Sequence, residues 1–165
     1  MNDSQTVALA TLERAGWATQ SASQAWRIPE QIRGRYHWAP SSVWDFICAT
    51  NLVVAPDQQS WFLTGRDYCG QSNSAFTWDE WEVQSLEAAA GDDEWCGDIK
   101  HFWDTHLPLA ASVRNGYEFL ALERDGLCVV VGAAPEFEDV SRMAASVGDL
   151  FQMIVSRDQS LGSWK

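Results

Sequence analysis

The sequence has few of the residues that usually carry metal binding, disulfides or export. It contains three histidines, and its four cysteines form no close pair, so zinc-ligand spacing is absent and a disulfide framework is not expected. No run approaches the roughly 18 apolar residues that span a bilayer, and the first residues lack the positive and apolar regions of an export signal. We therefore expect a cytoplasmic protein without metal or cofactor.

The remaining reactive residues match no common catalytic motif. His101 and His106 are five residues apart, whereas two histidines that hold a metal from one helix face lie three or four apart. Gly65 and Gly70 precede no Gly-Lys-Ser/Thr sequence, and no serine lies in a Gly-x-Ser-x-Gly turn. We expect a protein that is not an enzyme; distant residues converging in a cleft would be the exception.

Basic residues are also scarce, and the acidic ones are concentrated. The chain has 23 Asp and Glu against 11 Lys and Arg, a formal net charge of -12. Residues 79–104 hold nine of the acids and one base, Lys100, which leaves a net -8 in this segment. Such a field repels nucleic acid and anionic membranes and speeds association with cationic partners. A basic toxin, notably a nuclease, would suit it; a solvated loop that only keeps the protein soluble fits equally well.

Tryptophan is the second unusual feature, with ten residues in 165. Trp44, Trp61 and Trp103 lie in apolar patterns and are predicted to be buried. Trp78 and Trp81 are three residues apart, so they could share one core-facing ridge of a helix or, equally, a binding face.

Trp95 differs from the other tryptophans because it stands among acidic residues. It follows Asp92, Asp93 and Glu94 directly, which favours exposure. An exposed indole could stack on an Arg or Lys of a partner while its neighbours pair with the same charge. From this clustering alone, the candidate partner-binding residues are Asp92, Asp93, Glu94, Trp95 and Asp98.

Apolar residues at spacings of three and four predict several helices. The last is the clearest, because Ser146 and Asp149 can cap it and apolar residues follow at helical spacing. Thr77 and Glu80 form a capping-box pattern ahead of another. We expect a linking arm at 17–25, irregular structure at 65–74 and a frayed tail after Arg157. The predicted helices cover residues 4–15, 28–36, 43–51, 77–90, a short stretch from 99 toward Pro108, and 147–154.

A hairpin is predicted near the middle of the chain. The alternating run 117–122 lies between Asn115-Gly116 and Asp125-Gly126, and the apolar run 127–131 follows. We predict two antiparallel strands joined by a tight type I′ turn at Asp125-Gly126. The second strand would be central, because five consecutive apolar residues cover both faces of a sheet, and would bury Cys128. Further strands are predicted at 52–54 and 61–63, with an edge strand at 136–138.

The order of segments around this hairpin resembles that of a known family. It consists of Leu107-Pro108-Leu109, then Asn115-Gly116-Tyr117-Glu118-Phe119-Leu120, a turn glycine, a β-branched strand, Pro135-Glu136-Phe137 and a closing helix. This order resembles the back half of the SUKH superfamily, which holds bacterial toxin-immunity proteins, Syd and the fungal Smi/Knr-type cell-wall regulators. The resemblance covers residues 99–154; before that, only Trp61-Phe62-Leu63 offers a counterpart to an earlier strand of the family.

A length of 165 residues predicts one globular domain. The resemblance implies α+β architecture at residues 26–165, with a curved, largely antiparallel sheet of about four to six strands and helices on one side and at the ends. Residues 1–25 would add a helix and a linking arm. By resemblance this would be an immunity protein that binds and neutralises a cognate polymorphic or contact-dependent toxin without catalysis. The family's binding surface is no fixed motif, so no site residue is transferred. The alternative is a regulatory or scaffold protein that binds an endogenous cytosolic partner.

Overall fold

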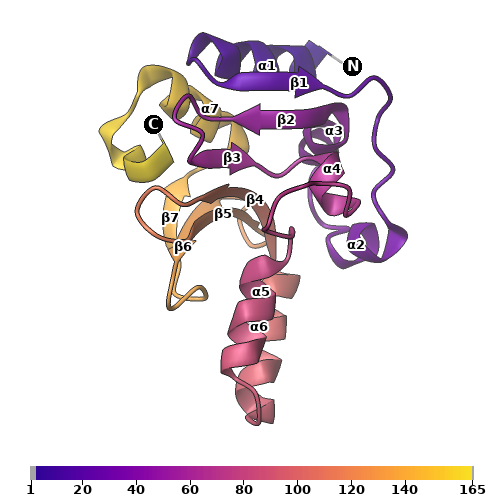
Figure 1. Cartoon of the computed structure of the whole chain (residues 1–165), viewed down its shortest axis with the longest axis vertical. Helices are drawn as coiled ribbons and strands as arrows, with labels where there is room; N and C mark the ends of the chain where they lie inside the picture. Colours follow the sequence, from indigo (N-terminus) through magenta and orange to yellow (C-terminus); the bar gives the residue numbers. More distant parts are fainter. Residues whose placement is uncertain (1–2, 165) are drawn as a thin grey trace.

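Seven antiparallel strands form a single sheet in the same order as in the sequence (Figure 1). The computed structural model describes residues 3–164, with the side chains of residues 7–164. The α+β class is as predicted, and the sheet has more strands than the four to six expected. The strands are β1 (Ala18–Ser21), β2 (Thr50–Val54), β3 (Ser60–Phe62), β4 (His106–Ser112), β5 (Glu118–Glu123), β6 (Val129–Ala133) and β7 (Ser141–Ala144).

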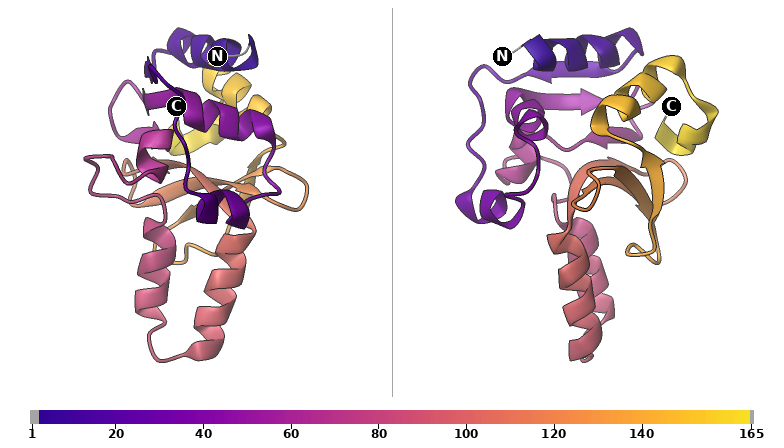
Figure 2. Two further views of the ribbon diagram at one scale, coloured as in Figure 1. Left: turned by 90° about the vertical axis from the view of Figure 1, so that its right-hand side faces the viewer. Right: turned by 180° about the vertical axis from the view of Figure 1, so that it is seen from behind.

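The helices fall into two groups. Helices α1, α3 and α7 gather at one end of the molecule, while α5 and α6 run side by side away from the other end (Figures 1 and 2). In the described part of the chain, no helix combines the length and apolar character needed to cross a bilayer. The helices are α1 (Asp3–Arg14), α2 (Glu30–Arg35), α3 (Ser41–Ala49), α4 (Gly65–Tyr68), α5 (Glu80–Ala88), α6 (Asp93–Asp104), α7 (Val147–Ser156) and the 3-10 helix η1 (Gln159–Trp164).

The predicted central hairpin is β5 and β6, and β6 has a neighbour on each side as expected. The predicted type I′ turn is wrong. The backbone N–H of Glu123 donates to the carbonyl of Cys128 (2.9 Å), so four residues form the loop, and positive φ occurs at Gly126 and Leu127 but not at Asp125. The register of the buried strand residues sets this loop length, because slipping by one residue would turn every side chain to the other face.

The sequence patterns do not predict strand β4; they place the end of a helix near Pro108. Helix α6 instead ends at Asp104, and every residue of β4 is buried. Pro108 cannot donate a ladder hydrogen bond, and the register of β4 with β5 shifts between Pro108 and Ala110. Such an irregularity is where a strand tolerates proline.

Both ends of the chain pack on the sheet, contrary to the linking arm and frayed tail expected. β1 pairs with β2, and Trp17 just before it is buried. At the other end, Ser60 donates from its hydroxyl to the Ser163 carbonyl (3.1 Å), and Trp164 is buried. Lys165 lies outside the described residues. The described residues at both ends, 3–25 and 159–164, therefore belong to elements that pack with the rest of the chain.

Two other local predictions are corrected. The edge strand expected at 136–138 lies later, at β7, because Phe137 turns into the core and leaves its segment without ladder pairing. Within the stretch read as irregular at 65–74, α4 forms one turn of helix. The hydroxyl and backbone of Thr64 and the carboxylate of Asp67 cap it reciprocally.

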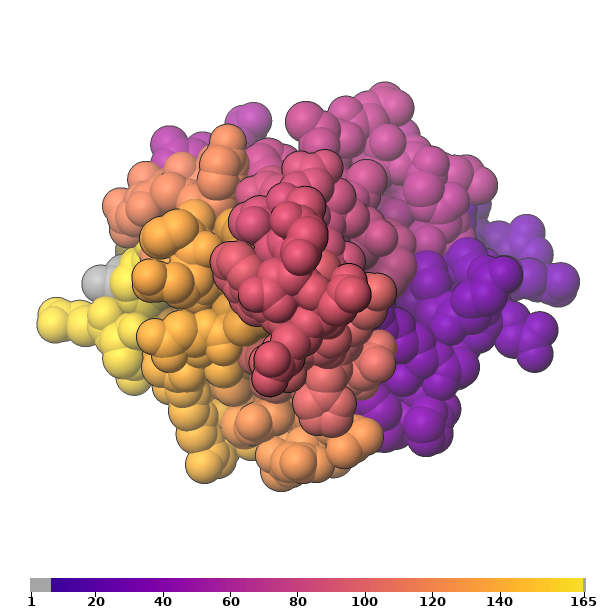
Figure 3. Space-filling view, turned by 90° about the horizontal axis from the view of Figure 1, so that it is seen from below, coloured from indigo at the N-terminus to yellow at the C-terminus, as the bar shows by residue number. Residues whose placement is uncertain are grey.

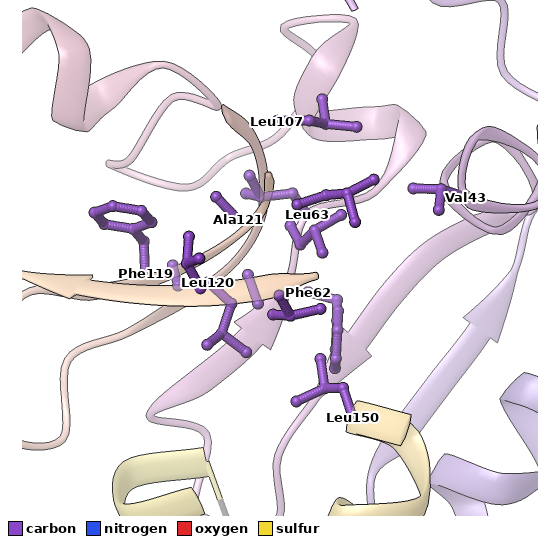
Figure 4. Close-up of a cluster of buried hydrophobic side chains, with 14 of the residues drawn as sticks. Val43, Phe62, Leu63, Leu107, Phe119, Leu120, Ala121 and Leu150 are labelled. Atoms are coloured by element: carbon purple, nitrogen blue, oxygen red, sulfur yellow. The ribbon is translucent and has the colours of Figure 1, made fainter. Parts of the chain in front are cut away.

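The core has an aromatic cluster on each side of the sheet. Phe46, Phe62 and Phe151 join α3, β3 and α7, with ring centroids 5.3 to 5.8 Å apart. Figure 4 shows this side, where Phe62 and Leu150 of α7 point toward one another. On the other side, Phe119 of β5 contacts Trp81 and Trp103, which come from α5 and α6. This second cluster fixes the helical hairpin to the sheet.

Candidate partner-binding surface

The segment richest in acid forms the two-helix hairpin α5–α6. One stripe of each helix faces the other: Trp81 and Ser85 of α5 are buried, as are Ile99 and Trp103 of α6. The indoles of Trp81 and Trp103 stack with centroids 6.3 Å apart and ring planes 18° apart. Burial of Trp103 is as predicted, and Trp81 belongs to a core-facing ridge rather than a binding face.

The turn between the two helices is built from residues that the sequence suits to it. Gly91 has φ of 96°, a conformation that glycine adopts without steric cost. The Asp92 carboxylate then accepts the backbone N–H of Trp95 (2.9 Å) and caps α6. Helix α6 therefore starts at Asp93, earlier than predicted, and the candidate residues lie in its first two turns instead of in a loop.

The base of the hairpin is held to the domain by a set of partly buried polar contacts. Arg35 of α2 donates two hydrogen bonds to Glu82 (2.7 and 2.9 Å) and one to Asp104 (2.7 Å). Burial alone would lower the pKa of Arg35, but the hydrogen bonds and charge of Glu82 outweigh it and raise the pKa. Trp103 Nε1 donates to the Glu138 carboxylate (2.9 Å). Two of the nine acids of the segment are thus structural.

The far end of the hairpin carries the five candidate residues, which we call the acidic tip: Asp92, Asp93, Glu94, Trp95 and Asp98. All five are exposed, and 49% of Trp95 is accessible to solvent. Within the described chain, no hydrogen bond or ion pair engages the side chains of Asp93, Glu94 or Asp98. Figure 3 views the molecule from this end and shows the hairpin in front, with no other segment over it.

Apart from the capping Asp92, the charges at the acidic tip do little for stability. Asp93 and Glu94 lie in the first turn of α6, where the helix dipole favours an acid. Glu94 and Asp98, however, are like charges four residues apart, which destabilises a helix by about 0.2–0.5 kcal/mol. These two effects are of similar size and opposite sign. The folding of the hairpin therefore does not account for so many acids at this place.

Glu87 adds a charge that the sequence-based candidates omit. It is exposed in the last turn of α5, where the helix dipole disfavours an acid, and in the described chain it has no polar partner. Glu87 lies five residues before Asp92, and the short turn between α5 and α6 keeps the two at the same end of the hairpin. The predicted helix over 77–90 already places Glu87 near this turn.

The histidines and cysteines form no second site. His106 is buried and His101 is exposed. Burial lowers the pKa of His106, whereas a hydrogen bond to the Phe102 carbonyl (2.8 Å) and the charges of Glu123 and Asp125 act to raise it. Among the described residues, no three His, Cys, Asp or Glu side chains converge as metal ligands, and all four cysteines are free thiols.

Comparison with known proteins gives no relative. No family model, no curated protein and no solved structure matches the chain.

Proposed function

We propose that this protein is a cytoplasmic immunity protein, as the resemblance to the SUKH superfamily implies, and that it binds a basic toxin domain through the acidic tip. The observation that carries the proposal is an exposed tryptophan among four carboxylates at the free end of a projecting hairpin. Trp is enriched among the residues that dominate binding energy at protein interfaces. An acidic surface without an exposed aromatic residue would serve solubility. An acidic surface around an exposed indole is better suited to binding a partner.

The chemistry of a basic toxin fits this surface. A nuclease needs Lys and Arg to hold phosphates, so its substrate-binding face is positively charged. The carboxylates of Asp93, Glu94 and Asp98 would attract that face and speed association, and Trp95 would stack on an Arg or Lys within it. The tip would then occupy the position of the substrate, so inhibition requires no catalysis.

The anchored base supports the same function. Trp81 and Trp103 pack against Phe119, and Arg35 ties both helices to α2, so the hairpin is held in one orientation before a partner arrives. A surface that is already ordered loses less conformational entropy on binding than a flexible loop does.

The test is co-expression with the toxin domain encoded beside this protein's gene, with growth of the cells and co-purification of the two proteins as readouts. The tip variant is D93N/E94Q/W95A/D98N, which leaves Asp92 as the cap of α6. The matched control is D125N/E136Q/D139N, which also removes three exposed carboxylates. We expect the control to protect and co-purify like the wild type and the tip variant to do neither.

Other outcomes separate the alternatives. Equal protection by the tip variant would place toxin binding on another surface and leave the acidic tip as a solvated end. Tip-dependent recovery of an endogenous cytosolic complex, without a toxin, would favour a regulatory or scaffold protein.

A further inference from the structure

A cavity lies at the end of the molecule opposite the acidic tip. It has a volume of about 420 Å³, opens to solvent, and is lined by residues of α1, α3 and α7 together with Phe62, Leu63 and Leu109. Figure 2 shows these three helices grouped at that end of the molecule. The floor of the cavity is formed by core residues, including Ile47, Leu63 and Leu109, each at most 4% exposed. At its rim, Val7 is 62% exposed. The cavity therefore leads from solvent into the hydrophobic core.

The described residues that line this cavity carry no charge. Among the residues whose side chains are described, 7–164, no acid, base, histidine or cysteine lines it. Its polar side chains are Thr11, Ser42 and Gln152; the buried Thr11 hydroxyl already accepts a hydrogen bond from Arg14 (3.2 Å). Ser42 and Gln152 are exposed and available at the mouth. At the apolar floor an ion would lose its hydration without a compensating charge in the described lining, so the cavity favours an uncharged molecule.

Small residues keep the cavity open where the helices could have closed it. Each of the three helices contributes one to the wall: Ala8, Ser42 and Gly148. A Cβ at Gly148 would meet only Ser146 Oγ, at 3.6 Å, so neither its conformation nor its neighbours require glycine. Glycine disfavours a helix relative to alanine, and protein interiors seldom leave voids larger than a water molecule. These three small side chains leave open the space that larger ones would fill.

We propose that this cavity binds a small, uncharged and predominantly apolar molecule. Its apolar body would contact Phe46, Phe62 and Leu109, and any hydroxyl or amide that it carries would lie at the mouth beside Ser42 and Gln152. The volume falls in the range of about 300–1,000 Å³ that is typical of ligand pockets. It exceeds the roughly 150 Å³ cavity that holds benzene, so a ligand larger than one ring fits. This inference is independent of toxin binding.

The test uses the neutral dye N-phenyl-1-naphthylamine, whose fluorescence rises in apolar surroundings, titrated into the full chain. We expect saturable binding of one dye per chain. Gly148→Phe should fill the cavity from α7 and weaken binding by roughly tenfold or more, with the far-ultraviolet circular dichroism of the folded protein retained. The matched control is Gly97→Phe in α6, where a Cβ also meets no backbone. It should bind the dye like the wild type.

Two further variants complete the design. Ala8→Phe fills the cavity from α1 and decides the question if Gly148→Phe does not fold. Trp95→Ala should leave dye binding unchanged, which separates the cavity from the exposed indole. Lack of saturable binding by the wild type, or equal binding by the wild type and a folded cavity-filling variant, would overturn the proposal.

Discussion

The base and the tip of the α5–α6 hairpin contain the same two kinds of residue, tryptophan and acid, in opposite settings. At the base, Trp103 is buried against Phe119, and Glu82 is paired with Arg35. At the tip, Trp95 is half-exposed, and Asp93 has no polar partner in the described chain. Composition alone shows a Trp-rich acidic segment. The position along two paired helices decides which members hold the fold and which stay exposed.

The largest expected effect on stability comes from Trp103→Ala, compared with Trp95→Ala. Trp103 is 1% exposed, so Trp103→Ala removes a filled volume from the core and should lower the free energy of unfolding by about 3–5 kcal/mol. Trp95→Ala should change it by no more than about 0.5 kcal/mol. Urea titration followed by circular dichroism measures both. Similar losses for the two variants would mean that the tip is as structural as the base.

The next effect concerns the ion pairs at the base. Arg35→Met leaves the largely buried Glu82 without its charged donor and should cost about 1.5–3 kcal/mol. Arg35→Lys should restore only part of this, because an ammonium group cannot reproduce the planar, two-pronged contact of the guanidinium. A matched control is Arg124→Met, which removes an exposed arginine whose contact with Asp125 is 3.5 Å long. That control should be close to neutral.

A smaller effect is a pH dependence confined to the base. Burial lowers the pKa of His106 below its ordinary 6.5, so the unfolded chain takes up the proton at a higher pH than the folded protein. Its stabilising contribution is complete above about pH 6.5 and is lost as the pH falls through that value toward the folded pKa. Denaturation midpoints between pH 7.5 and 5.5 should show this slope. His106→Gln should flatten it, whereas the exposed His101→Gln should not.

The smallest expected change is in the stability of a variant that loses three of the carboxylates at the acidic tip. D93N/E94Q/D98N removes a favourable dipole interaction and an unfavourable pair of like charges together. Its free energy of unfolding should stay within about 0.5 kcal/mol of the wild type in thermal or urea unfolding. A loss several times larger would show that these carboxylates support the hairpin, and it would remove the reason to assign them to a partner.

Sequence patterns predict much of the contrast between the buried base and the exposed tip of the hairpin. Helical spacing places Ile99 and Trp103 on one face, and the acidic surroundings of Trp95 correctly indicate its exposure. The run of acids does not show where α6 starts. Asp92 is an effective cap, but within a run of acids the same residue is also typical of a solvated loop. The pairing of α6 with α5 depends on contacts outside any local pattern.

Tertiary pairing accounts for β1 and β4, which the sequence patterns do not predict. β1 is short and mostly exposed, and its sequence, Ala-Thr-Gln-Ser, has no apolar alternation; its pairing with β2 makes it a strand. β4 is buried throughout, but Pro108 gives it the local signature of a helix end. In both cases the neighbouring strand determines the structure. The cavity likewise depends on the assembly of three helices.

The most direct test of the central claim is the association rate of the toxin domain with wild type and with D93N/E94Q/D98N across ionic strength, by stopped-flow fluorescence. If the tip receives a cationic partner, the variant should associate several-fold more slowly at low salt, and the two rates should converge as salt screens the charges. D125N/E136Q/D139N should follow the wild type. Equal rates for the wild type and the tip variant at all salt concentrations would contradict the account.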